Sequence, residues 1–151
     1  ALTDRPFGVN LVLEWDHAER LAVCAAHRVP HLSFFWGDPA PHVAAAHACG
    51  ATVWHTVASA EEARRVVAAG VDVVVAQGWE AGGHVWGEVA TLALVPAVAD
   101  AVGEVPVVAA GGIADGRGVA AALALGAQAA WIGTAFLLAD EANVHPRYRA
   151  R

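Results

Sequence analysis

Six short apolar runs, rich in valine and other strand-forming residues, alternate along the chain with stretches of helical pattern. Each run is almost continuously apolar instead of alternating, which is typical of parallel strands covered on both faces. The runs occupy residues 7–13, 31–36, 51–57, 71–77, 105–110 and 128–133. The pattern predicts six βα units that form one parallel sheet.

Capping residues predict where the intervening helices begin and end. Ser59 and Glu62 have the spacing of a capping box, and Gly70 ends that helix. Two more helices are bounded in the same way, one by Asp38-Pro39 and Gly50 and one by Asp115-Gly116 and Gly126. Residues 119–139 carry no charge and reach the length of a membrane span, but Gly126 and Gly133 divide them into a predicted buried helix and a buried strand.

Two α/β architectures fit this alternation, a doubly wound sheet and a (β/α)8 TIM barrel. Glycine-rich loops follow the last two strands, which favours the barrel, because its seventh and eighth strands commonly hold a phosphate. A complete barrel needs at least about 200 residues, and this chain has 151. We therefore predict a single partial barrel domain over residues 1–151, with six βα units visible and the first two strands missing.

Composition and charge indicate which classes of binding partner suit this chain. The chain is 57% hydrophobic and 16% charged, with a net charge of -6, so it is globular and has no basic patch for nucleic acid or an anionic membrane. No secretory signal is visible at Ala1, although the absence of Met indicates that the natural start lies elsewhere. We expect a cytoplasmic protein with a small-molecule partner.

Cysteine and histidine spacing gives no sign of a metal. Cys24 and Cys49 lie in Ala-rich helical stretches, so we expect them reduced and buried. His42 and His47 are five residues apart, which is not the i, i+4 spacing of a helical zinc pair. The sequence predicts no metal ligands.

Candidate chemistry gathers at three strand ends. The segment 71–87 ends a buried strand in a loop where Gly82 and Gly83 precede His84, and similar loops follow at 105–113 and 130–134. Backbone N–H groups of such loops can form a nest for a phosphate. The carboxyl ends of parallel strands meet at one edge of a sheet, so we expect the three loops to share a site.

These segments resemble, in order, the flavin-dependent nitronate monooxygenase family, also called nitropropane dioxygenases. The resemblance extends from PFGVNL at 6–11 through SFFWGDP at 33–39 and AQGWEAGGH at 76–84 to IGTAFLLADEA at 132–142. It implies FMN as the cofactor and a TIM barrel as the fold. The residues that it assigns to FMN binding are Asn10, Gln77, Gly82, Gly83, Gly111, Gly112, Trp131, Ile132, Gly133 and Thr134.

The resemblance also implies that His84 is the catalytic base. A neutral imidazole beside a flavin can take the α-proton from a nitroalkane, and the nitronate is then oxidised with dioxygen. Three positions depart from the family pattern: Trp131 stands where polar residues are common, Trp86 is inserted before Gly87, and Ala135 stands where Arg is frequent. The insertion affects the substrate pocket and Ala135 removes a possible contact to an anionic group, while phosphate binding depends mainly on the backbone and so little on Trp131.

Four other residues near these strand ends have no catalytic role in this prediction. We expect Glu80 to hold its loop through backbone hydrogen bonds. Trp36, Trp79 and Trp86 could line an apolar pocket or pack in the ordinary way.

Two other functions remain open. A flavin-dependent enoyl-acyl-carrier-protein reductase has the same loop motifs but takes hydride from NADH or NADPH. The chain could instead be an incomplete, non-catalytic barrel with apolar, unpaired edges at 7–13 and 128–133. A barrel dehydrogenase of purine nucleotides is a poor match, because it needs a cysteine in the loop after residue 113 and neither Cys24 nor Cys49 lies near it. Whether the chain forms a homo-oligomer stays open.

Overall fold

The structure, a computed structural model, describes residues 4–149, in which six strands alternate with helices. Each predicted run contains one strand, shortened by one to three residues where the chain turns. In chain order the elements are β1 (Gly8–Val12), α1 (Ala18–Ala26), β2 (His31–Phe35), α2 (Ala40–Ala48), β3 (Thr52–Val57), α3 (Ala60–Ala68), β4 (Val73–Gln77), α4 (Thr91–Val102), β5 (Val107–Ala110), α5 (Gly116–Ala124), β6 (Ala129–Trp131), the 3-10 helix η1 (Thr134–Leu138) and α6 (Pro146–Arg149).

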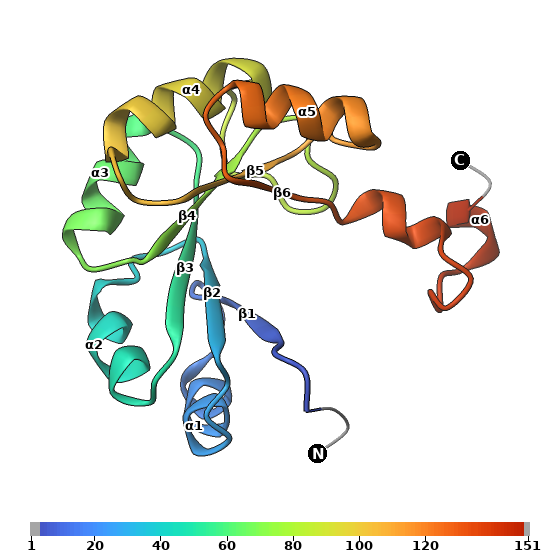
Figure 1. The fold of residues 1–151 in the computed structure, drawn as a ribbon. Helices are drawn as coiled ribbons and strands as arrows, with labels where there is room; N and C mark the ends of the chain where they lie inside the picture. Colours follow the sequence, from blue (N-terminus) through green and yellow to red (C-terminus); the bar gives the residue numbers. More distant parts are fainter. Residues whose placement is uncertain (1–3, 150–151) are drawn as a thin grey trace.

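All six strands are parallel and lie in the sheet in their chain order, β1 to β6. A doubly wound sheet reverses its strand order at a switch point, and this sheet has no reversal. Figure 1 shows α1 to α5 along the outside of the curved sheet, with both chain ends toward its open side. The arrangement is a half-barrel, which confirms the α/β class.

The core lies between the sheet and these outer helices. Outward-facing strand residues, among them Phe34, Val53 and Val74, are almost completely buried there. The opposite, concave face carries only a small apolar cluster of Val73, Val75 and Val108. The prediction of a sheet covered on both faces is therefore wrong for this chain, because no described helix covers the concave face.

The two edge strands border a hollow of about 690 Å³ on that concave face. Ala129 and Trp131 of β6 are exposed, so the prediction of a buried strand here is wrong; an edge strand has a neighbour on one side only. Most of α5 is exposed as well. The predicted unpaired edges, β1 and β6, are present within residues 4–149.

Two of the three predicted helix starts are capped by a side chain, while α2 begins after Asp38-Pro39 as predicted but its N-cap residue, Pro39, makes no side-chain cap bond. Ser59 Oγ accepts the N–H of Glu62, and the Asp115 carboxylate accepts the N–H groups of Arg117 and Gly118. Gly70 has φ of +97°, a left-handed conformation that suits glycine at a helix end. The Glu62 carboxylate accepts the N–H of Ala58 instead of Ser59, so the capping box is shifted by one residue on that side.

The structure also bears on the predictions about the two cysteines and the uncharged segment 119–139. Cys24 is buried, but Cys49 ends α2 and is only half-buried; both are free thiols. Within residues 4–149, no helix is long and apolar enough to cross a membrane.

Candidate active site

The loop after β4, residues 78–90, connects the carboxyl ends of several strands. The N–H of Gly78 donates to the carbonyl of Ala110 at 2.8 Å. A carboxylate oxygen of Glu80 lies 2.9 Å from the N–H nitrogen of Thr91, whose hydroxyl is 2.9 Å from the Gly111 carbonyl oxygen. These bonds tie the β4 loop to the start of α4 and to the β5 loop.

Glu80 holds this loop, as predicted. Burial acts to raise the pKa of Glu80, but hydrogen bonds from its own N–H and from the N–H and hydroxyl of Thr91 outweigh burial and leave its pKa below the ordinary value. The carboxylate therefore stays charged at neutral pH and serves as an acceptor.

Glycines allow the three loops to touch. A Cβ on Gly82 would lie 2.1 Å from Thr134 Oγ1, and one on Gly111 would lie 2.9 Å from the Gly78 carbonyl oxygen. Gly111 and Gly112 both have positive φ, at 104° and 66°. The glycine-rich segments after β4, β5 and β6 thus meet, and the residues predicted to bind FMN in them are Gly82, Gly83, Gly111, Gly112, Ile132, Gly133 and Thr134.

His84 lies on the other side of the β4 loop, between two indole rings. Its imidazole makes edge-to-face contacts with Trp15 at 5.6 Å and with Trp36 at 5.2 Å between ring centroids. Gln77 Nε2 donates to the His84 carbonyl at 3.2 Å, which places the strand-end amide directly under this residue. The rings orient the imidazole while leaving it exposed.

Gln77 has a second feature that bears on ligands. Its Oε1 is buried and has no hydrogen-bond partner among residues 4–149. A buried acceptor without a donor is costly, so a donor from outside the chain would stabilise this arrangement.

Asn10 and Trp131 lie in the hollow of the concave face, apart from His84. Asn10 is in register with Ser33, and Ser33 is in register with Trp54. The Trp131 ring meets the Trp54 ring edge-to-face at 6.1 Å. The indole of Trp131 therefore points along the inside of the half-barrel, and its backbone is the part that continues into the Gly133 loop.

Trp86, the inserted residue, is anchored outside the His84 region. Its Nε1 donates to the Glu62 carboxylate at 2.9 Å, and Glu62 is only 6% exposed. The adjacent Gly87 packs so closely that a Cβ there would lie 2.5 Å from the Ala58 Cβ. The insertion fastens the β4 loop to the turn between β3 and α3. Of the three predicted pocket tryptophans, only Trp36 contacts His84, while Trp79 is 62% exposed.

Replacing Trp86 with Phe should destabilise the chain by about 1–3 kcal/mol, because it removes one donor from a buried carboxylate and keeps the ring. Urea unfolding measures this change. Trp79→Phe is the matched control, since an exposed tryptophan should change stability by less than about 0.5 kcal/mol. Equal losses in the two variants would contradict the anchoring role of Trp86.

Sequence reasoning missed Trp15 and Glu62. Trp15 follows β1 in an ordinary polar turn, and nothing in its neighbours signals a contact with a residue 69 positions away. Glu62 was interpreted only as a helix cap. In the part of the chain that the structure describes, no group of three or more His, Cys, Asp or Glu side chains is placed to hold a metal ion.

Comparison with known proteins places this geometry in a family. The sequence profile described as nitronate monooxygenase matches residues 14–151. The chain belongs to the nitronate monooxygenase family. It is 51% identical to a putative monooxygenase of Mycobacterium tuberculosis over 127 residues, which cover 83% of this chain and 34% of that protein. It is 46% identical to the nitronate monooxygenase of Pseudomonas aeruginosa, covering 85% of this chain and 39% of that protein.

Solved structures agree on the fold. FabK from Thermotoga maritima superposes with a TM-score of 0.93 at 46% identity, covering 98% of this chain and 47% of that one. A nitroalkane oxidase from Streptomyces ansochromogenes gives 0.90 at 35% identity and covers 99% of this chain and 55% of that one. The chain thus spans about a third to a half of the proteins it matches.

Proposed function

We propose that this chain is the cofactor- and base-bearing part of an FMN-dependent nitronate monooxygenase, a (β/α)8 enzyme whose remaining strands lie outside these residues. The observation that carries the proposal is the placement of His84, which stands between two indoles on the same loop that meets the glycine-rich loops after β5 and β6. A base and a phosphate-type nest on one side of a parallel sheet suit a flavin enzyme.

The residues present fit FMN. Gly82, Gly111 and Gly112 let the three loops pack closely, and a phosphate can accept from the backbone N–H groups of these loops and of Gly133 and Thr134. The unpartnered Gln77 Oε1 suits an N–H donor of the flavin ring. Asn10, Gly83, Trp131 and Ile132 complete the proposed contact set, with Asn10 reaching it from the concave hollow.

The chain's own residues would perform the proton transfer. A nitroalkane binds with its α-carbon near His84, an imidazole nitrogen takes the α-proton, and the C–H electron pair stays on the substrate as the nitronate. Trp15 and Trp36 keep the imidazole in place and present an apolar wall. FMN, when bound, supplies the electron acceptor that the nitronate reduces and that dioxygen reoxidises.

A second candidate is thioester chemistry. FabK of Thermotoga maritima has the high structural similarity given above, and a 44% identical relative in Rhodococcus jostii is named as a dehydrogenase of a hydroxy-methyl-oxo-indene-carboxyl-CoA. Under this alternative the enzyme would be a flavin-dependent enoyl reductase, and NADH or NADPH would reduce the flavin. The third alternative, a non-catalytic half-barrel, predicts no flavin binding at all.

Gly82→Ala tests the FMN site. The new methyl group would overlap Thr134 Oγ1, separate the two loops and raise the dissociation constant of FMN at least about tenfold, or 1.4 kcal/mol. FMN fluorescence quenching measures the affinity. Gly116→Ala is the matched control, because no atom lies within 4 Å of the position of its Cβ.

The double variant Gly82→Ala with Thr134→Ala completes the cycle, with Thr134→Ala measured alone as reference. Removing the threonine hydroxyl should restore part of the affinity that Gly82→Ala loses. Unchanged FMN affinity in Gly82→Ala would contradict the proposed cradle, and no FMN binding by the unaltered chain would favour the non-catalytic alternative.

A further inference from the structure

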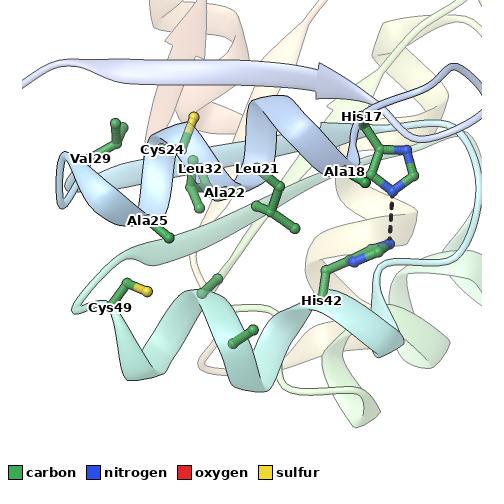
Figure 2. A pocket seen from close by; sticks show the side chains of 12 residues that line it. His17, Ala18, Leu21, Ala22, Cys24, Ala25, Val29, Leu32, His42 and Cys49 are labelled. Atoms are coloured by element: carbon green, nitrogen blue, oxygen red, sulfur yellow. Dashed lines mark hydrogen bonds between the residues drawn. The ribbon is translucent and has the colours of Figure 1, made fainter.

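A cavity of about 330 Å³ lies between α1 and α2 on the outer side of the sheet. Figure 2 shows His17 and His42 pointing toward one another at one end of it, with Cys24 and Cys49 toward the other. The two imidazole Nε2 atoms are 3.2 Å apart, and both rings are half-buried and reachable from solution. The proposed function uses neither histidine.

The hydrogen bonds of His17 prepare its Nε2 to be a ligand. Its Nδ1 lies 2.7 Å from the carbonyl oxygen of Trp15, an acceptor, so Nδ1 carries the proton and the Nε2 lone pair accepts the hydrogen bond from His42 Nε2. This is the outer-shell arrangement that metal-binding histidines commonly have.

Packing holds the His42 ring in place. It contacts the buried Phe34, at 5.8 Å between ring centroids, which restricts its movement. Two imidazoles thus face each other, His17 from the residue before α1 and His42 from α2.

We propose that His17 and His42 form a binding site for a divalent zinc-type cation, with water molecules as the remaining ligands. Two nitrogens bound to one tetrahedral zinc at about 2.0–2.1 Å lie about 3.3 Å apart, close to the separation seen here. Imidazole ligands favour zinc, copper and nickel, while calcium and magnesium require oxygen. Binding needs the His42 proton on Nδ1, a change of tautomer without a change of charge.

The site would affect the active region through Trp15. The Trp15 carbonyl contacts His17, and its indole contacts His84. A cation that joins α1 to α2 would therefore also hold one wall of the His84 pocket. The inference itself concerns cation binding and does not depend on the proposed function.

Calorimetric titration of the full chain with ZnCl2, with MgCl2 as a comparison, tests the site. We expect one zinc per chain, no heat from magnesium, and at least about tenfold weaker zinc binding in both His17→Gln and His42→Gln, since each loses one of two protein ligands. His27→Gln, an exposed histidine at the end of α1, should bind as the unaltered chain does.

Imidazole nitrogen NMR provides a readout independent of affinity. Zinc should shift the Nε2 resonances of His17 and His42 and leave His27 unmoved. Zinc binding that survives both glutamine variants, for instance through Cys24 and Cys49, would overturn the proposal. So would a lack of zinc binding by the unaltered chain, which would leave the pair as a simple hydrogen bond.

Discussion

Replacing His84 with Gln should lower kcat/KM for a neutral nitroalkane such as nitroethane about 10²- to 10⁴-fold, which is the usual contribution of a positioned general base. The same variant should keep most of its activity on ethyl nitronate, which has already lost the α-proton. Steady-state oxygen consumption with the two substrates measures both values. The expected result is a large loss on one substrate and a small loss on the other.

The comparison of substrates separates a base from a positioning residue. His27→Gln is the matched control and should leave both activities unchanged, because that histidine is exposed and lies at the far end of α1. Equal losses on nitroethane and ethyl nitronate would contradict the role of His84 as base and indicate that it only orients the ligand.

The stability of the chain should fall between about pH 6.5 and pH 4 because of His55. This residue lies on the outer face of β3, is 0% exposed, and has no hydrogen-bond partner for either ring nitrogen within residues 4–149. Burial lowers the pKa of His55 to about 4, partly offset by Asp38. In the unfolded chain the same imidazole has an ordinary pKa near 6.5.

The sign of the effect follows from proton binding. Between these two pKa values the unfolded chain binds a proton that the folded chain does not, so acid favours unfolding. The contribution is fully present above pH 6.5 and is lost as the pH falls toward 4, at a total of about 3 kcal/mol. That is a large part of the 5–15 kcal/mol that typically stabilises a domain.

Urea unfolding at several pH values, with His55→Leu beside the unaltered chain, isolates this contribution. The unfolding free energy of the unaltered chain minus that of His55→Leu should decrease by about 3 kcal/mol from pH 7 to pH 4, because only the unaltered chain carries the buried imidazole. His27→Gln should keep the original pH slope. If the difference in unfolding free energy between the unaltered chain and His55→Leu did not change with pH, His55 would not be the cause of the loss of stability in acid.

Most of the fold could be predicted from the sequence because its signals are local. Strand runs, helix caps at Ser59 and Asp115, and positive-φ glycines such as Gly70 depend on neighbouring residues only. The exposure of β6 could not be predicted, since an apolar run has the same pattern in a central strand and in an edge strand. Its side chains are exposed because no further described strand follows it.

The position of the candidate residues was predictable where the motif itself indicates a strand-end loop. His84 and the glycines stand in loops after parallel strands, and the strand order brings those loops together. The partners of these residues were not predictable, because Trp15 and Trp36 reach His84 through tertiary packing. The same holds for Glu62 with Trp86, and for His17 with His42, which are 25 positions apart in sequence.

The most direct test of the proposed function is the anaerobic reduction of the FMN-loaded protein. Ethyl nitronate and then NADH are added, and the flavin absorbance near 450 nm is recorded after each addition. We predict that ethyl nitronate alone bleaches the flavin and that admission of dioxygen restores the absorbance. Bleaching by NADH but not by ethyl nitronate would contradict the nitronate monooxygenase proposal and favour the enoyl reductase.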